Sequence, residues 1–352
     1  MGIYIKGIGI ISPQKAFDAS CFEKEILPFN NNRLSCCEPD YSSFIDTKQI
    51  RRMSNIIKMG VTASIIAMKD AGIEKLDAVI VGTGLGCLED TTSFLKKMIE
   101  FKEDMLNPTA FIHSTHNTIA SQIGLVLGCE GYNSTYSHRN ISFESALMDG
   151  ILLLKEKVAE NILAGGIDEL TETSFNILSR MGHFKKSQEL TDGSLYNRNT
   201  KGSIGGEGSA FFTIGNTPDT NSYAAINSVH TISFSSPEEV AAKAKVILTE
   251  NGIEKADILI AGYNGDMEDD KIFDEVASYL DMTNEVIKYK HLCGEFSTST
   301  GFALWMAANI IKRGNVPTVF ENNFRSEKKI NHILIYNQNN NLHHSLILIS
   351  SC

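Results

Sequence analysis

Residues 135–166 read TYSHRNISFESALMDGILLLKEKVAENILAGG, and this stretch decides the fold. It opens with polar residues and continues with apolar residues at the spacing of one helix face, which are Ala146, Leu147, Ile151, Leu152 and Leu154. A short apolar run, residues 161–164, follows and is closed by Gly165 and Gly166. We therefore expect a polar loop, a helix and then a buried strand, as in an α/β protein.

Glycines mark further apolar runs on both sides of this stretch. Residues 3–12 (IYIKGIGIIS) and 79–86 (VIVGTGLG) read as strands with glycine turns, and residues 202–212 (GSIGGEGSAFF) read as a glycine-rich turn before an antiparallel strand. The RRM tripeptide at residues 51–53 precedes a helical run that ends at Gly72. No single glycine turn is specific, but their order and spacing together are informative.

Asn107-Pro108, Asn117 and Gly131 complete this series. The whole set resembles the β-ketoacyl synthases of the thiolase superfamily. The resemblance implies a thiolase-like α/β fold, in which two related halves form a five-layer α-β-α-β-α sandwich. We assign residues 1–215 to an N-terminal, β-ketoacyl-synthase-like half and residues 216–352 to a C-terminal half.

The second half shows a shorter set of the same elements. We expect helices at residues 237–251 and 297–313 and strands at residues 258–261 and 285–289. In the thiolase fold two helices are buried between the halves. Here they would be the helix after Asn140 and the helix after Glu295.

The family's nucleophilic cysteine lies at a helix N-terminus ahead of an Ala-Gly-Gly motif. Placing residues 164–166 on that motif and counting back without a gap puts Asn140 at the cysteine position. A thiolate stabilised by the helix accepts an acyl group from a carrier thioester, whereas a carboxamide has no ionisable proton near neutral pH. We expect that Asn140 carries no acyl chain.

The two catalytic histidines of the family are also replaced. Asn264 follows the run DILIAGY (residues 257–263) at the first position, and Glu295 lies within KHLCGEFSTSTG (residues 290–301) at the second. The family's histidines donate hydrogen bonds that stabilise the enolate of a decarboxylated malonyl unit. Asn264 retains a donor, but an ionised Glu295 only accepts hydrogen bonds and repels an enolate. A neutral, buried Glu295 would rescue decarboxylation alone. No catalytic residue is therefore expected at the three family positions.

The resemblance also assigns supporting residues. Lys290 and Glu275 match the family's lysine and glutamate that brace the histidines, and Leu304 replaces a second glutamate. Residues 337–341 (NQNNN) match the family's glycine-rich gate, with less of the flexibility that glycine provides.

Other interpretations of these residues stay open. Asn140 belongs to the residue types preferred at helix N-caps. Ser142 as a substitute nucleophile would point away from the pocket, because it lies about 200° around the helix. Glu295 could act as a general base for another reaction. Residues 343–344, two histidines, are expected to be solvated in a polar tail.

Composition limits the remaining classes. The chain has 352 residues, 42% hydrophobic content and a formal charge of −10, which argues against nucleic acid as a partner. No apolar run reaches the roughly 18 residues of a membrane span, and no signal peptide is evident, so a cytoplasmic protein is expected. Seven cysteines without metal-ligand spacing predict reduced thiols, and we expect neither a metal nor a cofactor.

With these replacements the chain is similar to the chain-length factors of two-subunit polyketide and polyene systems, which commonly carry glutamine where this chain has Asn140. Those subunits lack the cysteine and form heterodimers with an active synthase. By resemblance, the strand at residues 132–136 would pair across the dimer axis. Phe111 and Ile112 would reach the partner's acyl tunnel, and the acyl chain would contact these two residues together with those at the three family positions, Asn140, Asn264 and Glu295.

Partners follow from the same resemblance. An acyl carrier protein is acidic, so it would dock on this acidic chain only through a local basic patch such as Lys185-Lys186 with Arg180, or on a basic partner subunit. Two alternatives to the heterodimer remain. One is an acyl-thioester enzyme that uses Glu295 and Asn264 for different chemistry, and the other is a homodimeric acyl-binding protein without turnover.

Overall fold

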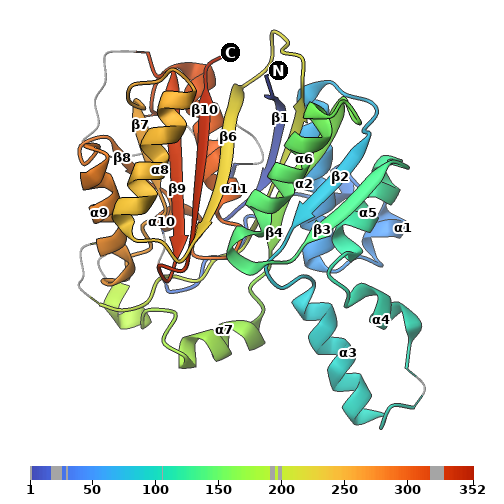
Figure 1. Cartoon of the computed structure of the whole chain (residues 1–352). Helices are drawn as coiled ribbons and strands as arrows, with labels where there is room; N and C mark the ends of the chain where they lie inside the picture. The colour runs from blue at the N-terminus through green and yellow to red at the C-terminus, as the bar shows by residue number, and fades with distance from the viewer. Residues whose placement is uncertain are drawn as a thin grey trace.

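A computed structural model describes residues 2–16, 26–28, 31–104, 106–190, 195–196, 200–317 and 329–352. Its strands form one ten-stranded sheet in the order β3-β2-β4-β5-β1-β6-β10-β9-β7-β8 (Figure 1). The strands are β1 (Tyr4–Ile11), β2 (Ala78–Gly82), β3 (Tyr132–Tyr136), β4 (Asn161–Asp168), β5 (Gly208–Gly215), β6 (Ala224–Ser233), β7 (Ile258–Ala261), β8 (Val286–Lys288), β9 (His332–Asn339) and β10 (His343–Ser350).

Helices connect and cover these strands. In the first half they are η1 (Tyr41–Ser43), α1 (Thr47–Ile50), α2 (Asn55–Ala71), α3 (Leu88–Glu100), α4 (Pro108–His113), α5 (Thr118–Leu127), η2 (Arg139–Ile141), α6 (Ser142–Lys155), α7 (Glu172–Arg180) and η3 (Ser187–Leu190). In the second half they are α8 (Pro237–Glu250), α9 (Asp269–Tyr279), α10 (Lys290–Cys293) and α11 (Thr300–Arg313). None of the helices that the structure describes is long and apolar enough to cross a membrane.

The sheet consists of two five-stranded sets with the same plan. In the first, β2 is parallel to β3 and β4, while β5 is antiparallel to β4 and β1. In the second, β7 is parallel to β8 and β9, while β10 is antiparallel to β9 and β6. The sets meet where β1 pairs with β6. This repetition confirms the two related halves, and we propose residues 1–215 and 216–352 as their extents.

Two helices lie between the halves and contact both. Helix α6 packs on β2, β3 and β4 and also on β6, and α11 packs on β9 and β10 and also on β1 and β5. Helices α2 and α5 cover the outer face of the first half. In the second half, α8 packs on β10 and on α9. The layers are therefore those of the predicted α-β-α-β-α sandwich.

Glycines inside strands permit this close packing. Strand β1 runs through Gly7 and Gly9, where a Cβ would collide with the backbone of α2, so these glycines are not the expected turn. Strand β4 likewise continues to Asp168 instead of closing at Gly165, because the ring of Phe211 occupies the space of a side chain there. In both strands glycine marks contact between layers rather than a chain reversal.

The predicted gate loop at residues 337–341 is instead part of a hairpin. Strand β9 extends to Asn339, and Asn340 and Asn341 turn the chain into β10 with φ values of 50° and 53°. Three residues, 340–342, separate the paired Asn339 and His343, and the two consecutive positive φ values are those of a type I′ turn, which asparagine tolerates. Asn337 and Gln338 are buried in β9. The prediction of an open loop here was wrong.

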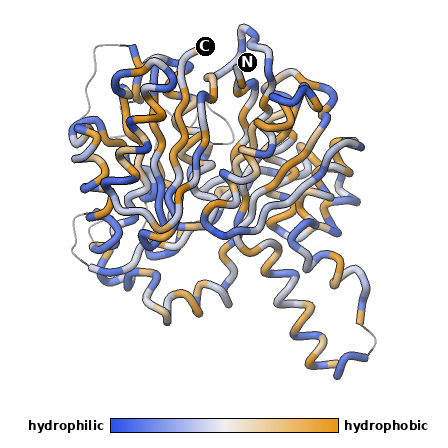
Figure 2. The backbone as a smooth tube through the Cα atoms, viewed as in Figure 1, coloured by the Kyte–Doolittle hydropathy of each residue, from blue (hydrophilic) through white to orange (hydrophobic). Residues whose placement is uncertain are grey.

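Helices α3 and α4 project from the rest of the chain (Figure 1). No residue of either helix is buried. Figure 2 shows that hydrophobic residues gather in the strands and in the helices between them, but also recur along α3. We call α3, α4 and the residues that join them, except residue 105, the projecting arm.

Candidate functional site

Asn140 lies in the turn η2 that precedes α6 and is half-buried. The N-cap residue of α6 is Ile141, and no side chain caps that helix end. The alternative interpretation of Asn140 as the cap of α6 is therefore wrong, because the intervening 3-10 turn shifts the start of the helix. The residue brings a carboxamide to the start of a central helix, where it has no nucleophilic atom.

Ser142 stabilises this turn. Its side chain is fully buried, its Oγ accepts a hydrogen bond from the backbone N–H of His138 at 2.8 Å, and its hydroxyl donates to the carbonyl of Arg139 at 2.7 Å. A hydroxyl with both bonds committed inside the turn is unavailable to a substrate. This supports a structural role over that of a substitute nucleophile.

The histidines at residues 343–344 lie in β10 rather than in a solvated tail. His344 is fully buried, and its Nδ1 is 3.0 Å from the hydroxyl of Tyr336. The ring of His343 meets the ring of His138 edge-on, with centroids 5.5 Å apart. The prediction of a polar tail missed that residues 343–350 form a strand buried on both faces.

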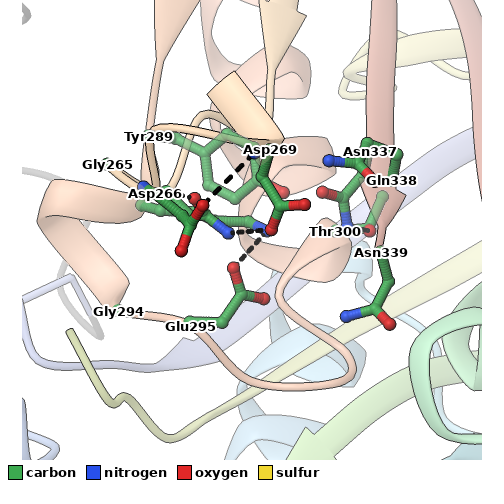
Figure 3. Close-up of polar contacts among 12 residues, drawn as sticks. Gly265, Asp266, Asp269, Tyr289, Gly294, Glu295, Thr300, Asn337, Gln338 and Asn339 are labelled. Atoms are coloured by element: carbon green, nitrogen blue, oxygen red, sulfur yellow. Dashed lines mark hydrogen bonds and ion pairs between the residues drawn. The ribbon is translucent and has the colours of Figure 1, made fainter. Parts of the chain in front are cut away.

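Asn264 follows β7 and holds the start of α9. Its Nδ2 donates to Asp269 Oδ2 at 3.0 Å, and its Oδ1 accepts from the backbone N–H of Asp266 at 2.9 Å. Its own backbone N–H donates to Asp270 Oδ1 at 3.0 Å. Figure 3 shows Asp266 and Asp269 gathered at this turn. The amide thus orders the turn before α9 through its oxygen and one of its two N–H donors.

Glu295 is paired with Lys290. The distance from Glu295 Oε2 to Lys290 Nζ is 2.6 Å, Lys290 is almost completely buried, and the Glu295 side chain keeps 24% exposure (Figure 3). The backbone of Glu295 is also fixed, since its N–H donates to the carbonyl of Ile204 and its carbonyl accepts from Gly206. A charge-assisted hydrogen bond this short stabilises the carboxylate, which accepts hydrogen bonds only.

The expected brace between Lys290 and Glu275 is absent. Glu275 is exposed on α9 and forms no ion pair with Lys290 in the part of the chain that the structure describes. Leu304 is fully buried in α11. The negative charge near Lys290 comes instead from Glu295 and Asp270. Burial raises the pKa of Asp270 to about 6, and the positive charge of Lys290 opposes this rise.

Glu144 is a second carboxyl group at this site, and sequence reasoning missed it. It lies in the first turn of α6, is fully buried, and has Lys290, Thr300 and Ser345 as neighbours. An acidic residue in a first helical turn suits an exposed position near the helix dipole, so its type suggested the surface. Its burial could have been inferred from its position on the helical wheel, which is about 60° from the apolar Leu147.

Asp168 anchors the segment that carries Glu295. One carboxylate oxygen accepts from the N–H of Gly84 at 2.7 Å, and the other accepts from the N–H and the hydroxyl of Thr298, both at 2.9 Å. Burial raises the pKa of Asp168 to about 6. The end of β4 is thereby tied both to the turn after β2 and to the loop before α11.

Comparison with known proteins identifies the family to which this chain belongs. The model of the β-ketoacyl synthase N-terminal domain matches residues 32–217, more than half of the chain. The chain belongs to the β-ketoacyl synthase family. A 3-oxoacyl-[acyl-carrier-protein] synthase 2 of Synechocystis sp. is 25% identical over 222 residues, which are 59% of this chain and 50% of that protein. The chain thus spans about half the length of the curated relative it matches.

Solved structures of the family share the fold over the full length. The ishigamide ketosynthase/chain length factor and a β-ketoacyl synthase from Burkholderia phymatum each superpose with a TM-score of 0.82, at 12% and 13% identity, over 100% of this chain and 99% of theirs. A type II PKS acyl carrier protein in complex with its ketosynthase, bound to the hexaketide, gives a TM-score of 0.75 at 16% identity over the same shares. At these identities the likeness establishes the fold.

One described cysteine lies near the Lys290–Glu295 pair. Cys293 lies between the two residues in sequence, is fully buried, and has a pKa that burial raises well above its ordinary value. A thiol without access or thiolate character is inert. The six cysteines that the structure describes are unpaired, and Cys21 lies outside the described residues.

The basic patch expected for carrier docking is incomplete. Lys185 is 1% exposed, and its Nζ donates to the carbonyl of Thr200 at 3.0 Å and to its hydroxyl at 2.7 Å. Of the three residues, only Lys186 and Arg180 are exposed. The sequence pattern was misleading because the two adjacent lysines differ in burial: Lys185 is buried and Lys186 is exposed.

Phe111 and Ile112, the expected tunnel residues, lie in α4 of the projecting arm. Their exposed fractions are 57% and 58%. The ring of Phe111 packs on that of Phe94 in α3 with centroids 5.6 Å apart. Both side chains are thus presented at the surface of the single chain.

Proposed function

We propose that this chain is a catalytically inactive synthase homologue, similar to a chain-length factor, that pairs with an active β-ketoacyl synthase in fatty acid, polyketide or polyene biosynthesis. The observation that carries the proposal is the 2.6 Å pair between Glu295 and Lys290, in a chain with Asn140 at the nucleophile position. Its acyl substrate would be delivered by an acyl carrier protein and processed on the partner.

The three family positions support the loss of condensation for separate physical reasons. Asn140 cannot form a thioester. The amide of Asn264 already donates one N–H to Asp269 and accepts from Asp266, so its orientation is set by the turn before α9 rather than by an enolate oxygen. Glu295 places negative charge where an enolate would develop. Restoring one position would leave the other two defects in place.

The outer edge of the sheet supports a role in pairing. Strand β3 (Tyr132–Tyr136) is the terminal strand on one side and bonds only to β2 within the sheet. Tyr132 is 43% exposed. An edge strand with free backbone groups can extend the sheet with a strand of another chain. We propose that β3 forms this contact with the active synthase.

The projecting arm supports the same surface. Exposed apolar side chains line α3, its C-terminal end and α4, and they are Leu95, Ile99, Phe101, Phe111 and Ile112. Exposed apolar patches of this kind mark protein interfaces. We propose that the partner covers them, and that Phe111 and Ile112 then limit the length of its acyl chain. Because Lys185 is buried, the carrier protein would dock on the partner.

Co-expression with intact synthases tests the proposal. Light scattering and mass spectrometry would report the stoichiometry of the complex and the acyl products. We expect a one-to-one heterodimer whose products are lost when this chain is omitted. The Phe111→Ala and Ile112→Ala complexes should make longer products. A stable homodimer that ignores every synthase would refute the proposal and favour an independent acyl-binding protein.

A further inference from the structure

The carboxyl group of Glu144 is buried without a bonding partner. Its side chain is 0% exposed, and neither carboxyl oxygen has a hydrogen-bond partner in the described part of the chain. It points from α6 of the first half toward Thr300 at the start of α11 and Ser345 in β10, whose hydroxyls lie close enough to lower its pKa. A buried ionised carboxylate in this setting is unfavourable by several kcal/mol.

The nearby cation is already committed to another carboxylate. Lys290 Nζ lies 2.6 Å from Glu295 Oε2, so its charge is neutralised within the second half. Further buried polar atoms without a partner surround the same region, including the hydroxyls of Tyr289 and Ser299. Figure 3 shows Tyr289, Thr300 and Glu295 around this centre. In the part of the chain that the structure describes, Lys290 is the cation that acts on Glu144.

We propose that Glu144 is held as a neutral carboxylic acid, and that loss of its proton acts as a pH-sensitive switch that draws Lys290 away from Glu295 and loosens the contact between α6 and α11. The two states differ in which carboxylate Lys290 stabilises. Asn140 lies in the turn η2, which leads directly into α6 and Glu144, so the change would reach the candidate site through the start of α6. This inference does not depend on the proposed function.

The electrostatic surroundings agree with this geometry. Burial raises the pKa of Glu144, and Thr300, Ser345 and Lys290 only oppose that rise. Tyr289 is the other titratable group that faces it, and burial raises the pKa of that hydroxyl well above its ordinary value. In both groups burial thus favours the uncharged form.

The other charged groups packed around α6 face different parts of it. Tyr132 and Tyr136 of β3 lie near Asp149, and His230 of β6 lies toward Lys155. His344 of β10 lies within hydrogen-bond distance of Tyr336. His138 and Arg139 belong to the turn at η2 that precedes α6. Asp270 and Cys293 reach Glu144 only through their shared neighbour Lys290. None of them offers Glu144 a counter-charge.

The direction of the pH effect follows from linkage. A carboxyl whose pKa is raised on folding keeps its proton in the folded chain after the unfolded chain has lost it. Its contribution to stability is therefore present below the unfolded pKa and is lost as pH rises toward the folded pKa. Glu144→Gln keeps the shape and has no proton to lose, so it should abolish that part of the slope.

Infrared spectroscopy reports the protonation state directly. The difference spectrum between the wild-type full chain and Glu144→Gln at neutral pH should contain the carbonyl stretch of a protonated carboxylic acid. Glu156→Gln, an exposed residue at the other end of α6, should give only the bands of an ionised carboxylate. Glu144→Met provides the same comparison if the glutamine variant does not fold. A carboxylate band for Glu144 at neutral pH would overturn the proposal.

Hydrogen exchange then tests the switch. With intrinsic rates corrected for pH, amide exchange in residues 142–155 and 300–313 should accelerate several-fold from pH 6 to pH 9 in the wild type, but not in Glu144→Gln. Equal acceleration in the wild type and in the Glu144→Gln and Glu156→Gln variants would show that Glu144 does not control the contact and would refute the switch.

Discussion

The centre of the molecule and its projecting arm treat polar and apolar groups in opposite ways. In the centre, Lys290 is fully buried and bonded to Glu295, and Asn264 is bonded to the start of α9. On the arm, Ile99 is 81% exposed and Phe111 is 57% exposed. Polar groups are thus bonded to one another in the centre, while apolar side chains are exposed on the arm. The proposed function, an inactive synthase homologue with a partner, accounts for this difference.

Removing the cation of the centre should have the largest effect. Lys290→Met leaves the carboxylate of Glu295 without its partner, so the free energy of unfolding should fall by about 3–5 kcal/mol. Urea denaturation measures this loss. The matched control is Lys201→Met, which breaks the exposed pair with Glu268 and should change stability little. Equal losses in the two variants would contradict a closed centre.

Adding charge to the arm should separate binding from folding. Leu95→Asp combined with Ile99→Asp places two carboxylates on the exposed apolar face of α3 and should weaken the complex with a synthase by about 100-fold, which is about 3 kcal/mol. Light scattering of mixtures measures the change, and the melting temperature of the single chain should stay within a few degrees. Val246→Asp on α8 is the control with a similar exposed apolar residue. Unchanged affinity would mean that the arm is not the interface.

Truncating Ser142 should have a smaller effect on stability and none on products. Ser142→Ala removes two hydrogen bonds inside the turn before α6 and should cost about 1–2 kcal/mol. Denaturation gives the cost, and product analysis of the complex gives the function. A complete loss of products from a folded complex would instead revive the serine nucleophile.

Acidification should weaken the centre by about 1 kcal/mol at pH 5.5 through His291. Burial lowers the pKa of His291 to about 4, and its Nδ1 lies 3.1 Å from the hydroxyl of Tyr196. The folded chain therefore holds this ring neutral, and the stability that depends on it is lost as pH falls from about 6.5 toward 4. Denaturation of wild type and His291→Gln across this range should diverge below pH 6.5. Parallel curves would contradict the assignment.

Much of the fold was predictable because it depends on local pattern. The apolar runs that became β2, β4 and β7 carry β-branched residues, and Gly72 ends α2 with the left-handed conformation expected of a helix C-cap. The order of these elements led to the synthase family, and with it to the two related halves. What local pattern does not report is which layers approach one another, so the glycines of β1 and β4 suggested turns where they allow packing.

The residues of the candidate site stay a prediction from the sequence, and their contacts were not predictable from it. Counting along the chain assigned Asn140, Asn264 and Glu295, yet the partners of these residues come from distant segments or from loop geometry. Glu275 was expected beside Lys290 but is exposed, and Glu144 was not expected there. Burial of a charged residue depends on what packs above it, as Lys185 also shows.

The most direct test of the central claim is intact-mass spectrometry of the purified heterodimer after exposure to an acyl-carrier thioester. We predict an acyl adduct on the synthase partner and none on this chain, with no loss of carbon dioxide from a malonyl thioester supplied to this chain alone. A stoichiometric adduct on this chain would contradict the account, because it would show that this chain has a functional nucleophile.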